Sequence, residues 1–312
     1  MSEPFAQPID ASTRYCAVYG HPIKHSASPA MQNAGIAKLG LNWRYLAFEV
    51  HPNNLRSAIA GAQAMKFIGL NLTVPHKVLA MDIVAVVEEG AKQYGAVNTV
   101  RFEVRAPSGE WRPLAQWEGD EVSETRSQGF NTDAEGFALS LREEFPNLTL
   151  AGASVVLIGT GGAGRTVALR MAQAGARAMS LIDVDASRVE QLVRELSAGF
   201  PATRVKIGYP DKTERADLLV NATPLGLKSG DRLPLEENRW PVGNAGFVYD
   251  LIYQPAETAL LKAAKAAGCR ATNGIGMLLY QGAKALEIWS GQTAPVDVMR
   301  RALEAQVYGA GH

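Results

Sequence analysis

The sequence contains little cysteine, no excess of charge and no long apolar run. Its 312 residues include two cysteines, Cys16 and Cys269, which excludes a disulfide scaffold and favours a reducing, cytoplasmic location. Both lie in apolar surroundings, so we expect buried, inert thiols. No run approaches the roughly 18 apolar residues of a membrane-spanning helix. Residues 1–13 lack the apolar centre of a signal peptide.

Charge is balanced: Lys plus Arg and Asp plus Glu each number 31. A neutral chain has no bulk attraction to nucleic acid or to an anionic membrane, so only local basic patches remain as an alternative. His21 and His25 have no third metal ligand nearby, and Pro22 disfavours a helical pair of histidines. We therefore predict no metal site and a small-molecule partner.

The first part of the chain alternates short apolar runs with helical patterns. The length of the whole chain, 312 residues, predicts about two domains. This alternation predicts a mainly parallel sheet. We expect Ser28 to cap the first helix, with Pro29 following and Gly40 ending it, and Asn53 to cap the second. The expected strands are 16–20, 43–50 and 67–74, and the expected helices are 28–39, 53–65 and 76–87.

Residues 96–105 are strand-like, and a turn follows at 107–109. The polar stretch 111–128 has no periodicity and is interpreted as an extended hairpin with a surface loop. A solvated insertion without a function explains it as well as a functional one does.

A second unit starts near Leu150 and shows the order of a doubly wound α/β domain. Two more helices close the chain, and Val296, Met299, Leu303 and Val307 share one helical face. The expected strands are 154–158, 178–184, 205–209, 217–222 and 247–251, and the expected helices are 163–174, 187–198 and 256–267.

A glycine-rich loop follows the apolar strand 154–158 directly. Gly159, Gly161 and Gly164 form a G-x-G-x-x-G pattern between this strand and a helix. One glycine permits the tight turn, the next lets a pyrophosphate approach the backbone, and the third lets helix and strand pack closely. The free N–H groups of the helix favour phosphates. The pattern favours a dinucleotide site over a glycine-rich turn without a ligand.

Asp183 lies 19 residues beyond Gly164, at the end of the next predicted strand. A carboxylate there accepts a hydrogen bond from the ribose 2′-hydroxyl and repels a 2′-phosphate. Val184 supplies no cation, although Arg188 is nearby. The pattern favours NAD over NADP. Asp185 in place of Asp183, or a merely solvated acid, are the alternatives.

Polar clusters mark several strand and helix boundaries of the first part. Ser26 and Ser28 lie beside a predicted helix N-terminus, where they can bind a small carboxylate or act only as turn and cap residues. Lys77 follows a buried strand that carries Thr73, and further clusters occur at 95–99 and 129–133. Such clusters in a chain with a nucleotide loop suggest a polar substrate pocket.

Together these stretches resemble the shikimate dehydrogenase family, in whose order they run from residue 20 to about 283. The resemblance implies a two-domain α/β oxidoreductase that uses a nicotinamide dinucleotide. The matching stretches are HPIKHSASPAMQN, GLNLTVPHK, GAVNT, GFNTDAEG, GTGGAGR, NATPLG, YDLIYQP and NGIGMLLYQGA.

The resemblance also implies residue roles. Lys77 and Asp133 match the catalytic pair, which would handle the proton of the C3 hydroxyl while a hydride passes to the nicotinamide C4. Ser26 and Ser28 would hold the substrate carboxylate, and Tyr253 would line the substrate site. The ring hydroxyls would be bound by Thr73, Asn98 and Gln281. The cofactor residues would be Gly159, Gly161, Gly162, Ala163, Gly164, Asp183, Asn221, Thr223, Gly274 and Met277.

The sequence departs from the family pattern at three places. Members that use NADP carry Asn-Arg-Thr where this chain has Asp183-Val184-Asp185. The lack of that arginine resembles the shikimate/quinate members that use NAD. Gln32 stands where the family often has His. The stretch 98–131 is longer than usual.

We therefore predict an α/β chain of two domains. Residues 1–132, completed by the C-terminal helices in 275–312, would bind the substrate, and 133–274 would form a doubly wound Rossmann domain. The predicted reaction is reversible oxidation of shikimate to 3-dehydroshikimate, with NAD favoured over NADP, by a monomer or a homodimer. Quinate or an amino-substituted shikimate is the alternative substrate.

Two other classes of protein are alternatives to this enzyme. A non-catalytic sensor of dinucleotide or of a shikimate-like acid would have no need of Lys77 and Asp133. A folate-type dehydrogenase of similar design would explain the glycine loop but not the serine pair or the 131–133 cluster.

Overall fold

The computed structural model describes residues 8–117, 124–228 and 230–309, and it divides into two compact units. Unit 1 comprises Met1–Glu135 and Leu279–His312, and unit 2 comprises Gly136–Leu278. The sequence predicts divisions at 132/133 and 274/275. The observed divisions fall slightly later because each lies inside a helix, α5 (Asp133–Glu144) and α9 (Ile275–Ser290).

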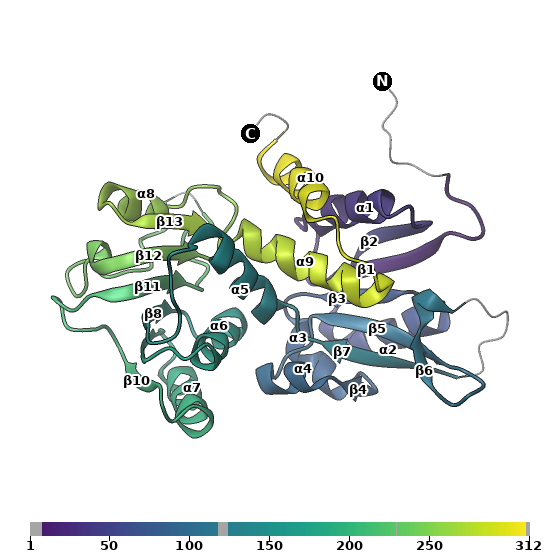
Figure 1. Ribbon diagram of the computed structural model, residues 1–312, viewed down its shortest axis with the longest axis horizontal. Coiled ribbons are helices and arrows are strands. Elements are labelled where there is room, and N and C mark those ends of the chain that lie inside the picture. Colours follow the sequence, from purple (N-terminus) through teal and green to yellow (C-terminus); the bar gives the residue numbers. More distant parts are fainter. Residues whose placement is uncertain (1–7, 118–123, 229, 310–312) are drawn as a thin grey trace. The chain divides into compact units, whose positions relative to one another are not determined.

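The sheet of unit 1 is mixed, with the strand order β2-β1-β3-β5-β7-β4 and with β6 paired to β5 (Figure 1). The expected parallel pairing is confirmed for β1, β2 and β3, but β5 runs antiparallel to β3, β6 and β7. The turn at 107–109 joins β5 to β6, and only antiparallel strands can be joined so tightly. The strands are β1 (Arg14–Gly20), β2 (Trp43–Glu49), β3 (Gly69–Leu72), β4 (Val86–Val87), β5 (Thr99–Arg105), β6 (Trp111–Pro113) and β7 (Thr125–Phe130).

One predicted helix of unit 1 is wrong in its second half. The helix expected at 76–87 ends after α3 (His76–Leu79) and a 3₁₀ turn (Ala80–Asp82). Val86 and Val87 instead form β4 beside β7, an environment that suits β-branched side chains. The other helices are α1 (Ser28–Lys38), α2 (Leu55–Ala64), which follows a 3₁₀ turn (Pro52–Asn54), α4 (Glu89–Tyr94) and α10 (Val296–Tyr308).

Two predicted helix caps are also wrong. Ser28 is the first residue of α1, and Ala27 precedes it without a side-chain cap. The Ser28 amide is 3.4 Å from Ser26 Oγ, so a side chain two residues earlier takes this donor. Asn53 lies inside the 3₁₀ turn and caps no helix. The predicted stop at Gly40 is confirmed, because its φ of +69° is left-handed.

The predicted apolar face of the last helix is confirmed: Met299 and Leu303 of α10 are fully buried. Deeper in unit 1, Trp289 of α9 donates from its indole N–H to the Val100 carbonyl at 2.9 Å. Gly69 lies beneath this indole, and a Cβ on Gly69 would meet the Trp289 ring and lie 2.5 Å from the Val100 oxygen. The sheet therefore needs a residue without a side chain at this point.

The hairpin predicted within 111–128 is wrong in its described part, because β6 and β7 each pair with β5 and β6 forms a hairpin with β5 instead; residues 118–123 lie outside the described residues. The buried Glu103 carboxylate pairs with Arg101 at 2.6 Å and with Arg126 at 2.7 Å. The Arg126 guanidinium also stacks 4.3 Å from the centre of the Trp111 ring. These contacts hold β6 and β7 against β5.

Unit 2 contains a fully parallel sheet with the order β10-β9-β8-β11-β12-β13 (Figure 1). Counted along the chain this order is 3-2-1-4-5-6, that of a Rossmann domain, which confirms the predicted fold class. The last strand was not predicted, because it is short and only partly buried. The strands are β8 (Ser154–Ile158), β9 (Ala178–Ile182), β10 (Arg204–Ile207), β11 (Ala216–Asn221), β12 (Ala245–Asp250) and β13 (Arg270–Asn273). The helices are α6 (Gly162–Gln173), α7 (Ala186–Gly199) and α8 (Ala259–Ala266), with a 3₁₀ turn (Val242–Asn244).

The two thiols differ. Cys16 is buried, and this burial raises the pKa of its thiol well above the ordinary value. Cys269 is partly exposed, which corrects the prediction, with its sulfur 3.4 Å from the Val242 carbonyl.

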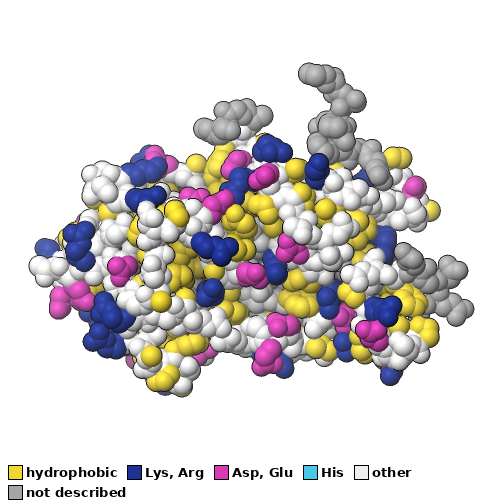
Figure 2. Space-filling model, viewed as in Figure 1, with side chains coloured by type: hydrophobic (Ala, Val, Ile, Leu, Met, Phe, Trp, Pro, Cys, Tyr) yellow, Lys and Arg dark blue, Asp and Glu magenta, His cyan; other side chains and the backbone are white. Residues whose placement is uncertain are grey.

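No helix within the described ranges is both long enough and apolar enough to cross a membrane. Nor do the described residues contain a group of three or more His, Cys, Asp or Glu side chains placed to hold a metal ion. Figure 2 shows basic and acidic side chains interspersed over much of the visible face, with Lys and Arg gathered near β10.

We expect the substitution Gly69→Ala to destabilise unit 1 by about 1–3 kcal/mol, because the added methyl group must displace the Trp289 indole or the Val100 backbone. The matched control is Gly61→Ala in α2, where a Cβ meets no atom within 4 Å. This control should raise stability by about 0.5–1 kcal/mol, because alanine is the better helix former. Urea unfolding midpoints of both variants test the packing; equal midpoints would contradict it.

Candidate active site

Lys77 and Asp133 lie in direct contact in unit 1. Lys77 comes from α3 and Asp133 begins α5, and Lys77 Nζ is 2.7 Å from Asp133 Oδ2. The Lys77 side chain is 30% exposed and the Asp133 side chain 10%. The pair is thus largely removed from water, yet its amine can be reached by a bound molecule.

The buried Asn98 side chain holds the other oxygen of Asp133. Asn98 Nδ2 donates to Asp133 Oδ1 at 2.9 Å and to Thr132 Oγ1 at 2.9 Å. Asn98 Oδ1 accepts from the Thr132 backbone N–H at 2.8 Å. The Asp133 carboxylate is therefore fixed at both oxygens, one by Lys77 and the other by Asn98.

Asn131 sets the backbone at the start of α5. Its Oδ1 accepts from the Asp133 N–H at 3.1 Å and from the Ala134 N–H at 3.3 Å, as a helix-capping side chain does. Its Nδ2 donates to the Ala96 carbonyl at 3.0 Å. The 129–133 cluster thus combines a strand end, a cap and a carboxylate in consecutive residues.

A buried polar network that the sequence did not predict continues behind Asn98. The Tyr45 hydroxyl donates to Asn71 Oδ1 at 2.7 Å, and Asn71 Nδ2 donates to Thr99 Oγ1 at 3.1 Å. Thr99 Oγ1 lies 3.2 Å from Thr132 Oγ1. Polar residues inside otherwise apolar predicted strands were the only signal for this network.

The other predicted substrate residues of unit 1 lie at different points. Gln281, on α9, has its Oε1 3.4 Å from Asn98 Nδ2. Thr73 follows β3 and its backbone N–H donates to the Tyr19 carbonyl at 3.0 Å. Ser26 and Ser28 lie next to each other at the start of α1. Within the described residues, no hydrogen bond joins Thr73 or either serine to the Lys77–Asp133 pair.

The glycine loop of unit 2 has the geometry that its spacing predicts. Gly159 has a φ of +93°, which favours glycine, and a Cβ on Gly164 would collide with the Gly159 carbonyl. A Cβ on Gly161 would meet only Arg188 Nη1, at 3.9 Å, and one on Gly162 would meet nothing within 4 Å. Gly161 and Gly162 therefore leave open space at the first turn of α6, where Ala163 is exposed, which fits the approach of a pyrophosphate.

A cavity of about 670 Å³ opens beside this loop, which is within the size range of cofactor sites. Its lining includes Gly159, Gly161, Asp183, Val184, Arg188 and Thr223. Arg232 and Arg239 also line it. The described residues thus fit a dinucleotide.

Asp183 is bonded to the glycine loop. Its Oδ2 accepts from the Thr160 backbone N–H at 2.6 Å and hydroxyl at 2.9 Å, and its Oδ1 accepts from the Asp185 N–H at 3.0 Å. Partial burial acts to raise the pKa of Asp183, but these hydrogen bonds outweigh it and hold the pKa below its ordinary value. Asp185 instead caps α7 and pairs with Arg188 at 3.4 Å.

Asn221 is fully buried and does not line the cavity. Asn221 Oδ1 accepts from the Thr223 N–H at 3.0 Å and hydroxyl at 2.7 Å, and its Nδ2 donates to buried Asp250 at 2.9 Å. Burial raises the pKa of Asp250. Asn221 therefore positions Thr223, which lines the cavity.

The remaining predicted residues of unit 2 lie outside the lining of this cavity. Gly274 precedes α9, and a Cβ there would collide with the Leu251 backbone. Met277 lies in the first turn of α9 and is half-buried. Tyr253 follows β12, and burial raises the pKa of its hydroxyl.

Two family models match the chain. Residues 18–100 match the shikimate dehydrogenase substrate binding domain, and residues 274–304 match the shikimate 5′-dehydrogenase C-terminal domain. A curated relative from Methanopyrus kandleri, named shikimate dehydrogenase (NADP(+)), is 40% identical over 300 residues, which cover 95% of this chain and 96% of the relative.

Two solved structures are similar to this chain over nearly its whole length. A shikimate dehydrogenase in complex with NADP⁺ is 31% identical with a TM-score of 0.83, and the match covers 98% of this chain and 99% of that one. A quinate dehydrogenase from Corynebacterium glutamicum in complex with NAD is 29% identical with a TM-score of 0.78 over 94% of this chain and 99% of that one.

We expect Gly161→Ala to weaken dinucleotide binding at least tenfold while leaving the thermal unfolding midpoint within about 1 °C. The φ of −64° at Gly161 suits alanine, so only a ligand would meet the new methyl group. Gly164→Ala is the contrasting variant, because its methyl group collides with the Gly159 backbone and should lower the unfolding midpoint by several degrees. Calorimetric titration with NAD and thermal melts measure both; an unchanged NAD affinity in Gly161→Ala would place the pyrophosphate elsewhere.

Proposed function

Because this chain belongs to the shikimate dehydrogenase family, we propose that it reversibly oxidises the C3 hydroxyl of shikimate to 3-dehydroshikimate with a nicotinamide dinucleotide. The observation that carries this proposal is the contact between Lys77 and Asp133, held by Asn98. A protein that only binds its ligand has no need of such a pair.

The chemistry requires the hydroxyl to lose its proton as the carbon loses a hydride. A dinucleotide held by the glycine loop and the cavity beside it would supply the acceptor of that hydride and its two electrons, the nicotinamide C4. The proton passes to the Lys77–Asp133 pair, which exchanges it with solvent. Asn98 keeps the carboxylate aimed at Lys77, so that the amine is directed toward the hydroxyl.

Substrate binding uses the polar residues around this pair. Ser26 and Ser28 hold the substrate carboxylate at the N-terminus of α1, where free backbone N–H groups favour an anion. Asn98 and Gln281, which lie 3.4 Å apart, bind the ring hydroxyls together with Thr73. The family resemblance also assigns Tyr253 of unit 2 to substrate binding.

We further propose that NAD is the preferred dinucleotide. The Asp183 carboxylate lines the cavity and carries a charge that its hydrogen bonds stabilise, so it repels a ribose 2′-phosphate. Val184, which is 93% exposed, supplies no cation. Arg188 lines the same cavity but already pairs with Asp185. Quinate is the second candidate substrate, since a similar structure is a quinate dehydrogenase that holds NAD.

We expect Lys77→Met and Asp133→Asn each to lower kcat for shikimate oxidation by about 10²-fold or more, because each removes one member of the proton-transfer pair. NAD affinity should be unchanged, since neither residue lines the dinucleotide cavity. The control is Lys92→Met, which breaks an exposed lysine–glutamate pair of the same unit. Initial rates and NAD titration make the comparison, and parental turnover in both variants would refute these roles.

We expect Asp183→Asn to lower the ratio of kcat/KM with NAD to kcat/KM with NADP at least tenfold. The amide oxygen can still accept from Thr160, whereas the charge that repels a 2′-phosphate is lost. Glu190→Gln, at an exposed position of α7, removes the same charge as a control. A ratio that is equal in Asp183→Asn and the parent would mean that Asp183 does not face the ribose.

A further inference from the structure

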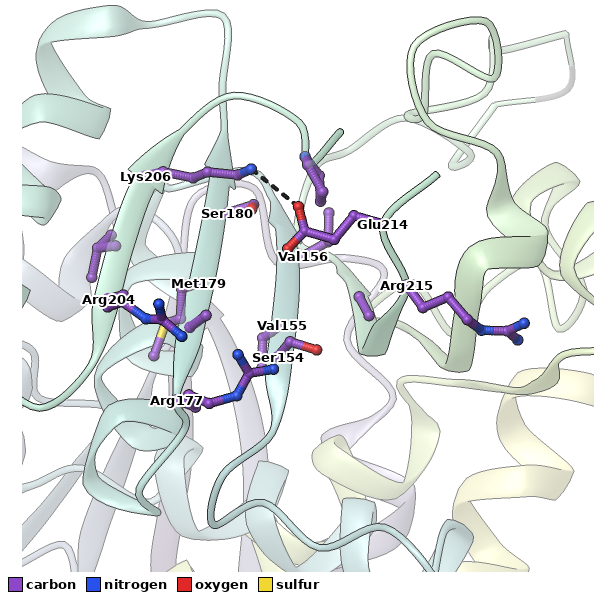
Figure 3. Close-up of a pocket in the computed structure, with 14 residues that line it drawn as sticks. Ser154, Val155, Val156, Arg177, Met179, Ser180, Arg204, Lys206, Glu214 and Arg215 are labelled. Atoms are coloured by element: carbon purple, nitrogen blue, oxygen red, sulfur yellow. Dashed lines mark hydrogen bonds and ion pairs between the residues drawn. The ribbon is translucent and has the colours of Figure 1, made fainter. Parts of the chain in front are cut away.

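A second cavity lies on one face of the unit 2 sheet. The connection between β10 and β11 contains no helix, so residues 208–215 cross this face only as a loop. The cavity has a volume of about 220 Å³ and is lined by β8, β9, β10 and this connection (Figure 3). No residue lines both this cavity and the one beside the glycine loop.

Small side chains form the floor of this cavity. In the sheet register Arg204 lies beside Ala178, and Lys206 lies beside Ser180. Adjacent residues of parallel strands project to the same face, so Ala178 and Ser180 leave space next to the long side chains of β10. The cavity follows from this contrast in side-chain size.

Two arginines reach over the cavity, Arg204 from β10 and Arg177 from the residue before β9 (Figure 3). The Arg204 N–H donates to the Arg177 carbonyl at 2.9 Å, so the two residues are immediate neighbours. Arg177 Nε also donates to the Gly152 carbonyl at 3.3 Å. Within 8–117, 124–228 and 230–309, neither arginine takes part in an ion pair, while Glu214 pairs with Lys206 at 3.5 Å. Two neighbouring positive charges without a counter-charge favour an anion between them.

Ser180 adds a hydroxyl to the same cavity. The residue is 6% exposed and lines the cavity. The buried side-chain atoms without a partner in the described ranges do not include Ser180 Oγ, so this hydroxyl is open to the cavity and can donate to a ligand oxygen.

We propose that this cavity binds a small phosphate-bearing anion. The guanidinium groups of Arg177 and Arg204 bind its oxygens, as arginine forks bind phosphate, and the Ser180 hydroxyl donates a further hydrogen bond. A phosphate dianion balances both guanidinium charges. The 220 Å³ volume limits the ligand to inorganic phosphate or a small phosphate monoester.

The test is calorimetric titration of the full chain with inorganic phosphate and, separately, with glycerol 3-phosphate. Ionic strength is held constant, and the protein is saturated with NAD so that the glycine loop is occupied. We expect one saturable site, with Kd raised at least tenfold in Arg177→Gln and in Arg204→Gln and several-fold in Ser180→Ala. The control Arg194→Gln, at an exposed position of α7, should bind like the parent.

Arg177, Arg204 and Ser180 belong neither to the Lys77–Asp133 pair nor to the lining of the dinucleotide cavity, so turnover without phosphate should equal that of the parent. Tighter binding of inorganic phosphate identifies free phosphate as the ligand, and tighter binding of glycerol 3-phosphate identifies a phosphate monoester. Both results support the site. The proposal is overturned by absence of saturable binding, by equal affinity in parent, Arg177→Gln and Arg204→Gln, or by saturable binding of succinate but not of either phosphate.

Discussion

The Asn98 side chain is the constraint on which the site of unit 1 depends. One buried amide donates to the Asp133 carboxylate and to the Thr132 hydroxyl, and it also accepts from the Thr132 backbone. Amide, carboxylate and amine thereby form one connected arrangement. A buried network that is fully satisfied in this way is rigid, whereas one missing partner leaves several buried polar atoms unpaired. This rigid network fixes the position of Asp133 relative to Lys77.

In unit 2 the glycine loop is also held in one conformation, but by contacts of a different kind. The loop is fixed by backbone contact between Gly159 and Gly164, and by hydrogen bonds from Thr160 to the Asp183 carboxylate. The same carboxylate therefore stabilises the loop and sets the charge beside the dinucleotide cavity. This double role explains why a ribose-facing acid can also hold the loop that binds the phosphates.

Local sequence patterns were sufficient to predict several elements and turns of the fold. The strand 154–158, the glycine loop and the left-handed Gly40 are dictated by neighbours in the sequence, and the structure confirms them. The network of Tyr45, Asn71 and Thr99 was beyond sequence reasoning, because it joins three strands that meet only through long-range pairing. The sequence around Val86 and Val87 has a helical pattern, but pairing with β7 makes these residues a strand. Ser28 is not a cap, and its backbone N–H donates to the Ser26 hydroxyl instead.

The most direct test of the account is a set of initial rates, followed at 340 nm, for shikimate and quinate each combined with NAD and with NADP. We predict the highest kcat/KM for shikimate with NAD. Turnover mainly with NADP would contradict the role given to Asp183. Absence of turnover in all four combinations would contradict the assignment of Lys77 and Asp133 to oxidation of a ring hydroxyl.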